Sequence, residues 1–116
     1  MNYEINTTYL YSQFGENHSA RRKAFDSFLN NTRVNWISVA SLMEHGQFSQ
    51  AAEKLMALNP SVKLAGFGDL AREIVQFSQA IRMNLLGPEA ARVRYESINL
   101  EIAIARSLVK TELDCL

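Results

Sequence analysis

The chain has 116 residues, of which 47% are hydrophobic, and its 12 basic and 12 acidic side chains give a formal net charge of zero. This length and apolar content predict one globular domain over residues 1–116, which can bury a core unaided. The balanced charge argues against nucleic-acid binding, which usually requires a basic surplus. No apolar run approaches the roughly 20 residues that cross a bilayer, so no membrane association is expected.

The chemistry-bearing residues are sparse. The single cysteine, Cys115, has no partner for an internal disulfide and no neighbours at metal-ligand spacing. No Gly-rich phosphate loop, pair of catalytic carboxylates or His/Cys cluster is present, so we expect no metal, no other cofactor and no small-molecule substrate. The first residues lack the basic and apolar regions of a signal peptide. These features predict a cytoplasmic protein.

Apolar residues recur at three- and four-residue steps along most of the chain, a spacing that is typical of amphipathic helices. A short helix is expected over residues 7–14, with Tyr9 or Leu10 facing inward. The first long helix is predicted over residues 19–44, and a glycine ends it. Weak helix formers at residues 30–32 favour a bend or break within it.

The central helix is predicted to begin at about residue 47. Its inward stripe consists of Phe48, Ala51, Leu55, Leu58, Val62 and Ala65. Pro60 lies inside this helix by pattern, and it has no N–H to donate to the carbonyl of Met56. We therefore expect a kink or short break at residues 58–60, with helix resuming through Leu64.

Two further helices follow. The third carries a stripe of Leu70, Ile74, Phe77 and Ile81. Pro88 is well placed as the first residue of the last helix, which is predicted to run to about Glu112. Its inward line is expected to consist of Tyr95, Ile98, Ile102, Ala105 and Val109, widened by Leu100, Ile104 and Leu108. The pattern predicts an all-α fold, an antiparallel up-down bundle of four main helices joined by short loops.

One large apolar side chain interrupts the polar face of the central helix. At about 100° per residue, Met56 lies roughly 120° from the centre of the apolar stripe. Its neighbours there are Ser49, Glu53, Pro60 and Lys63. Met56 is either an exposed contact for a partner, which its flexible thioether suits, or a packing residue beside the proline.

The spacing around Met56 resembles the histidine-phosphotransfer (HPt) domain of bacterial phosphorelays. That family carries His-x-Leu-Lys-Gly-Ser, with a glycine ten residues after the histidine and often another ten residues before it. Here Gly46, Leu58, Ser61 and Gly66 fall in register. The resemblance, over roughly residues 7–110, implies an HPt-like four-helix bundle with a short N-terminal helix.

The three chemical positions of this motif differ. The histidine position holds Met56, the lysine position Asn59 and the glycine position Pro60. A thioether cannot accept a phosphoryl group as an imidazole nitrogen does. Asparagine has no charge to neutralise phosphoryl oxygens, and proline fills room that glycine would leave for a partner. We therefore expect no enzymatic activity and no catalytic residue.

The resemblance implies a non-catalytic signalling adaptor, which binds a response-regulator receiver domain or a histidine kinase and modulates phosphorelay signalling. The expected partner-binding residues are Met56, Glu53, Ala52, Asn59, Pro60, Lys63 and Ser49. The alternative is a helical interaction module unrelated to phosphorelays, such as a chaperone, an anti-activator or an assembly subunit. A third possibility is a true phosphotransferase that uses His18 or His45, although no carboxylate or serine pattern accompanies either.

Overall fold

The computed structural model describes residues 10, 13–15 and 17–115. Helix covers 87% of these residues and no strand occurs among them, which confirms the predicted all-α class. The elements are α2 (His18–Asn31), the π-helix η1 (Thr32–Trp36), α3 (Ile37–Glu44), α4 (Phe48–Leu64), α5 (Gly68–Arg82) and α6 (Pro88–Cys115). The expected helix over residues 7–14 lies mostly outside the described residues, but Leu10, one of the two residues expected to face inward, is described and is buried.

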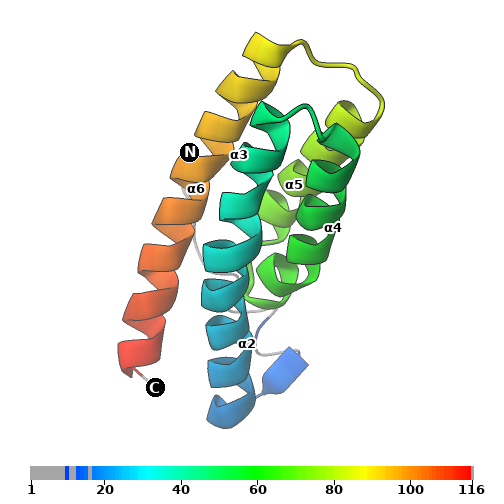
Figure 1. Ribbon diagram of the computed structural model, residues 1–116. Coiled ribbons are helices and arrows are strands. Elements are labelled where there is room, and N and C mark those ends of the chain that lie inside the picture. The colour runs from blue at the N-terminus through cyan, green and yellow to red at the C-terminus, as the bar shows by residue number, and fades with distance from the viewer. Residues whose placement is uncertain (1–9, 11–12, 16, 116) are drawn as a thin grey trace.

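The elements α2, η1 and α3 follow one another without a loop, so they form a single rod (Figure 1). The irregularity expected near residues 30–32 is a π-helix that starts at Thr32, not a break. The Thr32 hydroxyl donates to the carbonyl of Phe28 at 2.8 Å. Arg106 of α6 donates to the carbonyl of Leu29 at 2.7 Å. In an α-helix this carbonyl would instead accept a bond from the N–H four residues later in the chain. These competing bonds accompany the wider turn of η1.

Three helices end in the same way. Gly46, Gly66 and Asn84 adopt positive φ angles of 72°, 98° and 56° directly after α3, α4 and α5. In each case the next N–H donates to the carbonyl five residues before it, at 2.8, 3.2 and 2.9 Å. This is the Schellman arrangement, which glycine adopts without strain and asparagine tolerates. Local sequence therefore sets where each helix stops.

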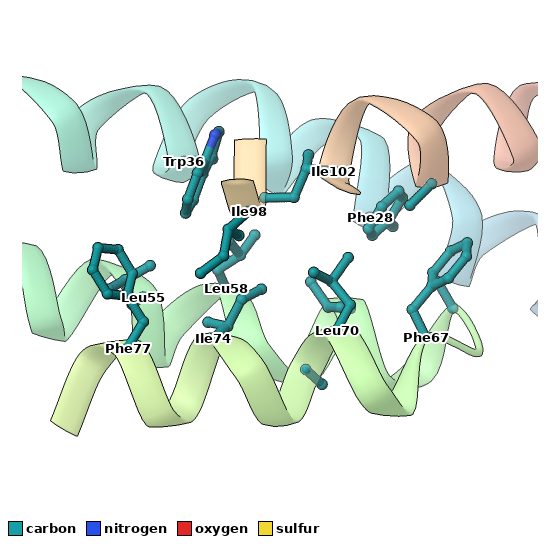
Figure 2. Close-up of a cluster of buried hydrophobic side chains, with 14 of the residues drawn as sticks. Phe28, Trp36, Leu55, Leu58, Phe67, Leu70, Ile74, Phe77, Ile98 and Ile102 are labelled. Carbon is teal, nitrogen blue, oxygen red and sulfur yellow. The ribbon is translucent and has the colours of Figure 1, made fainter. Parts of the chain in front are cut away.

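Apolar side chains from all the helices meet in one core. Figure 2 labels ten of its members: Phe28, Trp36, Leu55, Leu58, Phe67, Leu70, Ile74, Phe77, Ile98 and Ile102. The predicted stripes of α4 and α5 supply half of these side chains, and the two helices pack along each other. Burial of these faces, more than helix propensity, holds the fold together.

Polar bonds tie α6 to the α2–α3 rod. Trp36 donates from its Nε1 to the Oδ1 of Asn99 at 2.7 Å. Its indole stacks on the ring of Tyr95, with centroids 4.4 Å apart. Together with the bonds of Arg106 to Leu29 and Thr32, these contacts fix the side of α6 that faces the rod.

The predicted inward line of α6 is only partly right. Ile98, Ile102, Ala105 and Val109 are buried, and Leu108 is half-buried. The expectation for Leu100 and Ile104 is wrong, because their side chains are 65% and 41% exposed. The helix packs against α2 and α5 over only part of its circumference, and these two residues lie on the opposite side.

One buried carboxylate in α6 provides a test of the packing. Glu101 is only 7% exposed, and its Oε2 has no hydrogen-bond partner among the described residues. An unsatisfied buried acceptor costs about 1–3 kcal/mol, so we expect Glu101→Met to raise the free energy of unfolding by about that amount. Urea denaturation would measure the gain, which should be smaller for Glu101→Gln. A loss of stability in the methionine variant would contradict the expectation.

Candidate functional site

The middle of α4 carries the surface that the sequence singled out. Met56 is 42% exposed, so its side chain reaches solvent while the rest of it is covered by neighbours. The other exposed residues of this surface, hereafter the Met56 face, are Ser49, Glu53, Pro60 and Lys63. Of the two interpretations left open by the sequence, the exposed one describes Met56 better.

Two of the expected contact residues are placed differently. Ala52 is fully buried, and its carbonyl accepts a 3.0 Å hydrogen bond from the hydroxyl of Ser78. The expectation that Ala52 contacts a partner is therefore wrong, because α5 packs against that side of α4. Asn59 is half-buried, and its Oδ1 is enclosed without a hydrogen-bond partner among the described residues. It lies at the border between the face and the core.

Pro60 does not interrupt α4, which runs from Phe48 to Leu64, so the expected short break is absent. Leu58 and Val62, on either side of the proline, are both fully buried. The hydroxyl of Ser61 donates to the carbonyl of Leu58 at 2.9 Å. Core packing on both sides thus keeps the chain helical where the proline removes one backbone bond.

The positions in register with the HPt motif show a consistent pattern of burial. Leu58 and Ser61 are buried, whereas Met56 points outward from the same helix. Gly46 and Gly66 take left-handed conformations just outside the two ends of α4. The scaffold positions of the motif are therefore inward or at helix ends, and the position of its reactive residue is on the surface.

A groove adjoins the Met56 face on the side of α3. It has a volume of about 430 Å³ and is lined by Leu42, Gln50, Glu53, Lys54 and Ala57. Glu53 belongs to both the groove and the face. Neither Glu53 nor Lys63 forms an ion pair with another described residue. Both charges are thus free to meet a partner.

Leu64 is an apolar residue of this surface that the sequence reasoning missed. It is exposed at the end of α4, one helical turn beyond Pro60. The available signal was its spacing of eight residues from Met56, which at about 100° per residue puts the two side chains roughly 80° apart. Leu64 therefore extends the apolar part of the face toward the end of the helix.

The two histidines are not close to Met56 in the chain and belong to other elements. His18 is the first residue of α2, and His45 follows the end of α3, at the opposite end of the rod (Figure 1). Both are exposed, and the Nδ1 of His45 lies 2.7 Å from the carbonyl oxygen of Ser41. Neither forms an ion pair with a described carboxylate. The part of the chain that the structure describes contains no group of three or more potential metal ligands.

Comparisons of the chain with protein families, with curated proteins and with solved structures found no match. Among the described residues, no helix combines the length and the apolar character needed to cross a bilayer.

Proposed function

We propose that this protein is a pseudo-HPt domain, a cytoplasmic adaptor of a bacterial phosphorelay that binds a receiver domain or a histidine kinase without carrying phosphate. Its fold would be an antiparallel up-down four-helix bundle. The short connections at residues 45–47, 65–67 and 83–87 support this topology, because short loops make consecutive helices antiparallel neighbours.

The observation that carries the proposal is the exposed thioether of Met56 in register with the motif. Leu58 and Ser61 are buried as the scaffold of such a motif requires, yet the outward position holds a side chain that cannot accept a phosphoryl group. An apolar side chain surrounded by polar neighbours is a common form of binding anchor. The face thus keeps what a docking surface needs and lacks what the chemistry needs.

The surroundings of Met56 suit a protein partner. Methionine adapts its shape to an apposed surface, and Leu64 adds a second apolar contact. Glu53 and Lys63 place opposite charges on the same face, which can orient a partner more than they strengthen its binding. The groove lined by Glu53 offers a place for a protruding side chain.

We expect Met56→Asp to weaken binding of the cognate receiver or kinase domain by at least about 30-fold, the equivalent of a hot-spot loss of 2 kcal/mol. Isothermal titration against the receiver and kinase domains of the native host would measure this. The matched control is Met83→Asp, which changes a methionine that is 66% exposed in the α5–α6 connection and should leave binding unchanged.

The same variant tests whether Met56 belongs to the surface. Its free energy of unfolding should change by about 1 kcal/mol or less, as at other exposed positions. A loss of several kcal/mol would make Met56 a core residue and remove the basis for the docking face. Undiminished binding by a folded Met56→Asp protein would show that the partner binds elsewhere.

The alternative, an interaction module unrelated to phosphorelays, is favoured by the apolar side chains exposed away from α4. Ile37, Leu85 and Leu100 are each more exposed than Met56. A chaperone, anti-activator or assembly subunit could use such surfaces. Recovery from the native host of a specific partner that has neither a receiver nor a kinase domain, and whose binding survives Met56→Asp, would favour this alternative.

A further inference from the structure

An apolar stripe runs along the outer side of α6. Val93, Leu100 and Ile104 are 54%, 65% and 41% exposed. They are seven and four residues apart, so they share one face of the helix. The buried residues Ile98 and Ile102 lie on the opposite face. Because three large apolar side chains in line are unusual on a free helix surface, this stripe indicates an interface.

The stripe has the spacing of a helix–helix seam. Its positions, at alternating steps of four and three residues, are Val93, Ser97, Leu100, Ile104, Ser107 and Thr111, all exposed. This is the repeat by which one helix presents a continuous seam to another. Leu100 and Ile104 occupy the middle of the seam, Ser97 and Ser107 flank them, and Val93 and Thr111 are its two ends. Such a seam fits a partner helix of similar length and similar distribution.

The surface beside the seam widens the apolar area. Ala103 is exposed next to Ile104 and, with the exposed Ile37 of α3, lines a surface groove of about 230 Å³ between η1, α3 and α6. A small residue at this place lets a second helix approach closely. The contact area therefore includes part of the α2–α3 rod as well as α6, which lie side by side (Figure 1).

We propose that the occupant of the seam is the α6 of a second copy of this chain, running antiparallel and crossing near residue 102. In that arrangement Leu100 of one copy packs against Ile104 of the other. Glu96 and Lys110 lie six residues before and eight residues after the crossing. At 1.5 Å per residue, they come within about 3 Å of the same level in the two copies, giving two pairs of opposite charge.

Charge also decides the direction of the pairing. Glu96 and Lys110 are exposed on the same edge of the seam, and Glu96 already accepts a 2.9 Å bond from Arg92 of its own helix. In a parallel pair, Glu96 would instead lie opposite Glu101 and Lys110 opposite Cys115, so neither charge would gain a partner of opposite sign. With a formal net charge of zero, the two copies do not repel each other at long range.

Sedimentation between about 1 µM and about 500 µM protein tests the association, because dimer formation follows mass action. We expect the mass to rise from that of a monomer toward twice that value, and Leu100→Asp to remain monomeric throughout with unchanged helix content. Leu85→Asp, which alters an exposed leucine of the α5–α6 connection, should associate like the unmodified chain. A monomer at all concentrations, or association that survives Leu100→Asp, would overturn the proposal.

Crosslinking tests the direction. In the antiparallel pair, the two Cys115 residues lie 26 residues apart along the axis, about 39 Å, too far for a disulfide. Mild oxidation should therefore give no linked dimer, whereas an equimolar mixture of Ser97→Cys and Ser107→Cys chains, each also carrying Cys115→Ser, should be linked by a short bis-maleimide. A Cys115 disulfide dimer that Leu100→Asp abolishes would show a parallel pair. The seam lies on a different helix from the Met56 face, so these outcomes are independent of the proposed function.

Discussion

Replacement of Leu58 by alanine is expected to lower the free energy of unfolding by about 2–5 kcal/mol, the range for truncating a fully buried leucine. Leu58 is completely inaccessible in the middle of α4, within the core that Figure 2 shows. The removed methyl groups leave a cavity that the surrounding side chains fill only in part. Such a loss is a large share of the stability of a domain of this size.

The control is the same chemical change at Leu100, which the apolar pattern of α6 also placed inward. Because this side chain is 65% exposed, Leu100→Ala should change stability by only about 0.5 kcal/mol or less. Both variants would be compared by urea denaturation at low protein concentration, where self-association contributes little. Equal losses at the two positions would contradict the packing of α6.

The second large effect concerns phosphotransfer. The unmodified chain should gain no phosphate from a phosphorylated receiver domain, and Met56→His alone should gain none either. A chain that combines Met56→His, Asn59→Lys and Pro60→Gly is expected to accept one acid-labile phosphate. The imidazole supplies the acceptor nitrogen, the lysine neutralises phosphoryl charge, and the glycine opens the approach. Intact-mass measurement would detect the change from no phosphate to one phosphate per chain.

The structure shows that this reconstruction is compatible with the fold. Asn59 is half-buried, so a lysine there can lay its methylenes along the helix and hold its ammonium in water. Glycine at position 60 is easier to accommodate in a helix than the proline it replaces. The control is Met83→His, an exposed histidine elsewhere.

Two outcomes would count against this account. Transfer by the single variant Met56→His would mean that Asn59 and Pro60 are incidental. A folded triple variant that binds a receiver but takes no phosphate would limit the resemblance to the scaffold alone.

The buried face of a helix could be predicted from the sequence where its apolar residues form a single stripe. In α4 and α5 the apolar residues form one stripe each, and nearly all of it is buried. In α6 two series compete, one through Ile98 and Ile102 and one through Leu100 and Ile104, and the spacing is helical for both. Only the side that α2 and α5 occupy decides between them. The π-helix could not be predicted from local sequence either, because it is accompanied by a hydrogen bond from Arg106 to Leu29, two residues that are 77 positions apart in the chain.

The candidate site was predictable to the level of a helical face. The wheel of α4 placed Met56, Glu53 and Lys63 on the surface, and the structure agrees. It did not exclude Ala52, because a small side chain is compatible with either side, and the position of α5 is needed to bury it. It also predicted a kink or short break at Pro60, and the break is absent, since local preference takes no account of the buried residues on both sides of the proline.

The unbroken passage of α4 through Pro60 affects what a partner would recognise. The carbonyl of Met56 is the one that the missing N–H of residue 60 would have bonded, so it lacks the regular four-residue bond of an α-helix. A thioether makes apolar contacts that have no preferred direction. A carbonyl oxygen, in contrast, accepts a hydrogen bond only from a donor in a restricted range of positions. Met56 would therefore supply both an apolar contact and a directional hydrogen-bond acceptor. A partner with an N–H or hydroxyl beside its apolar contact would be selected over a partner whose contact surface is only apolar.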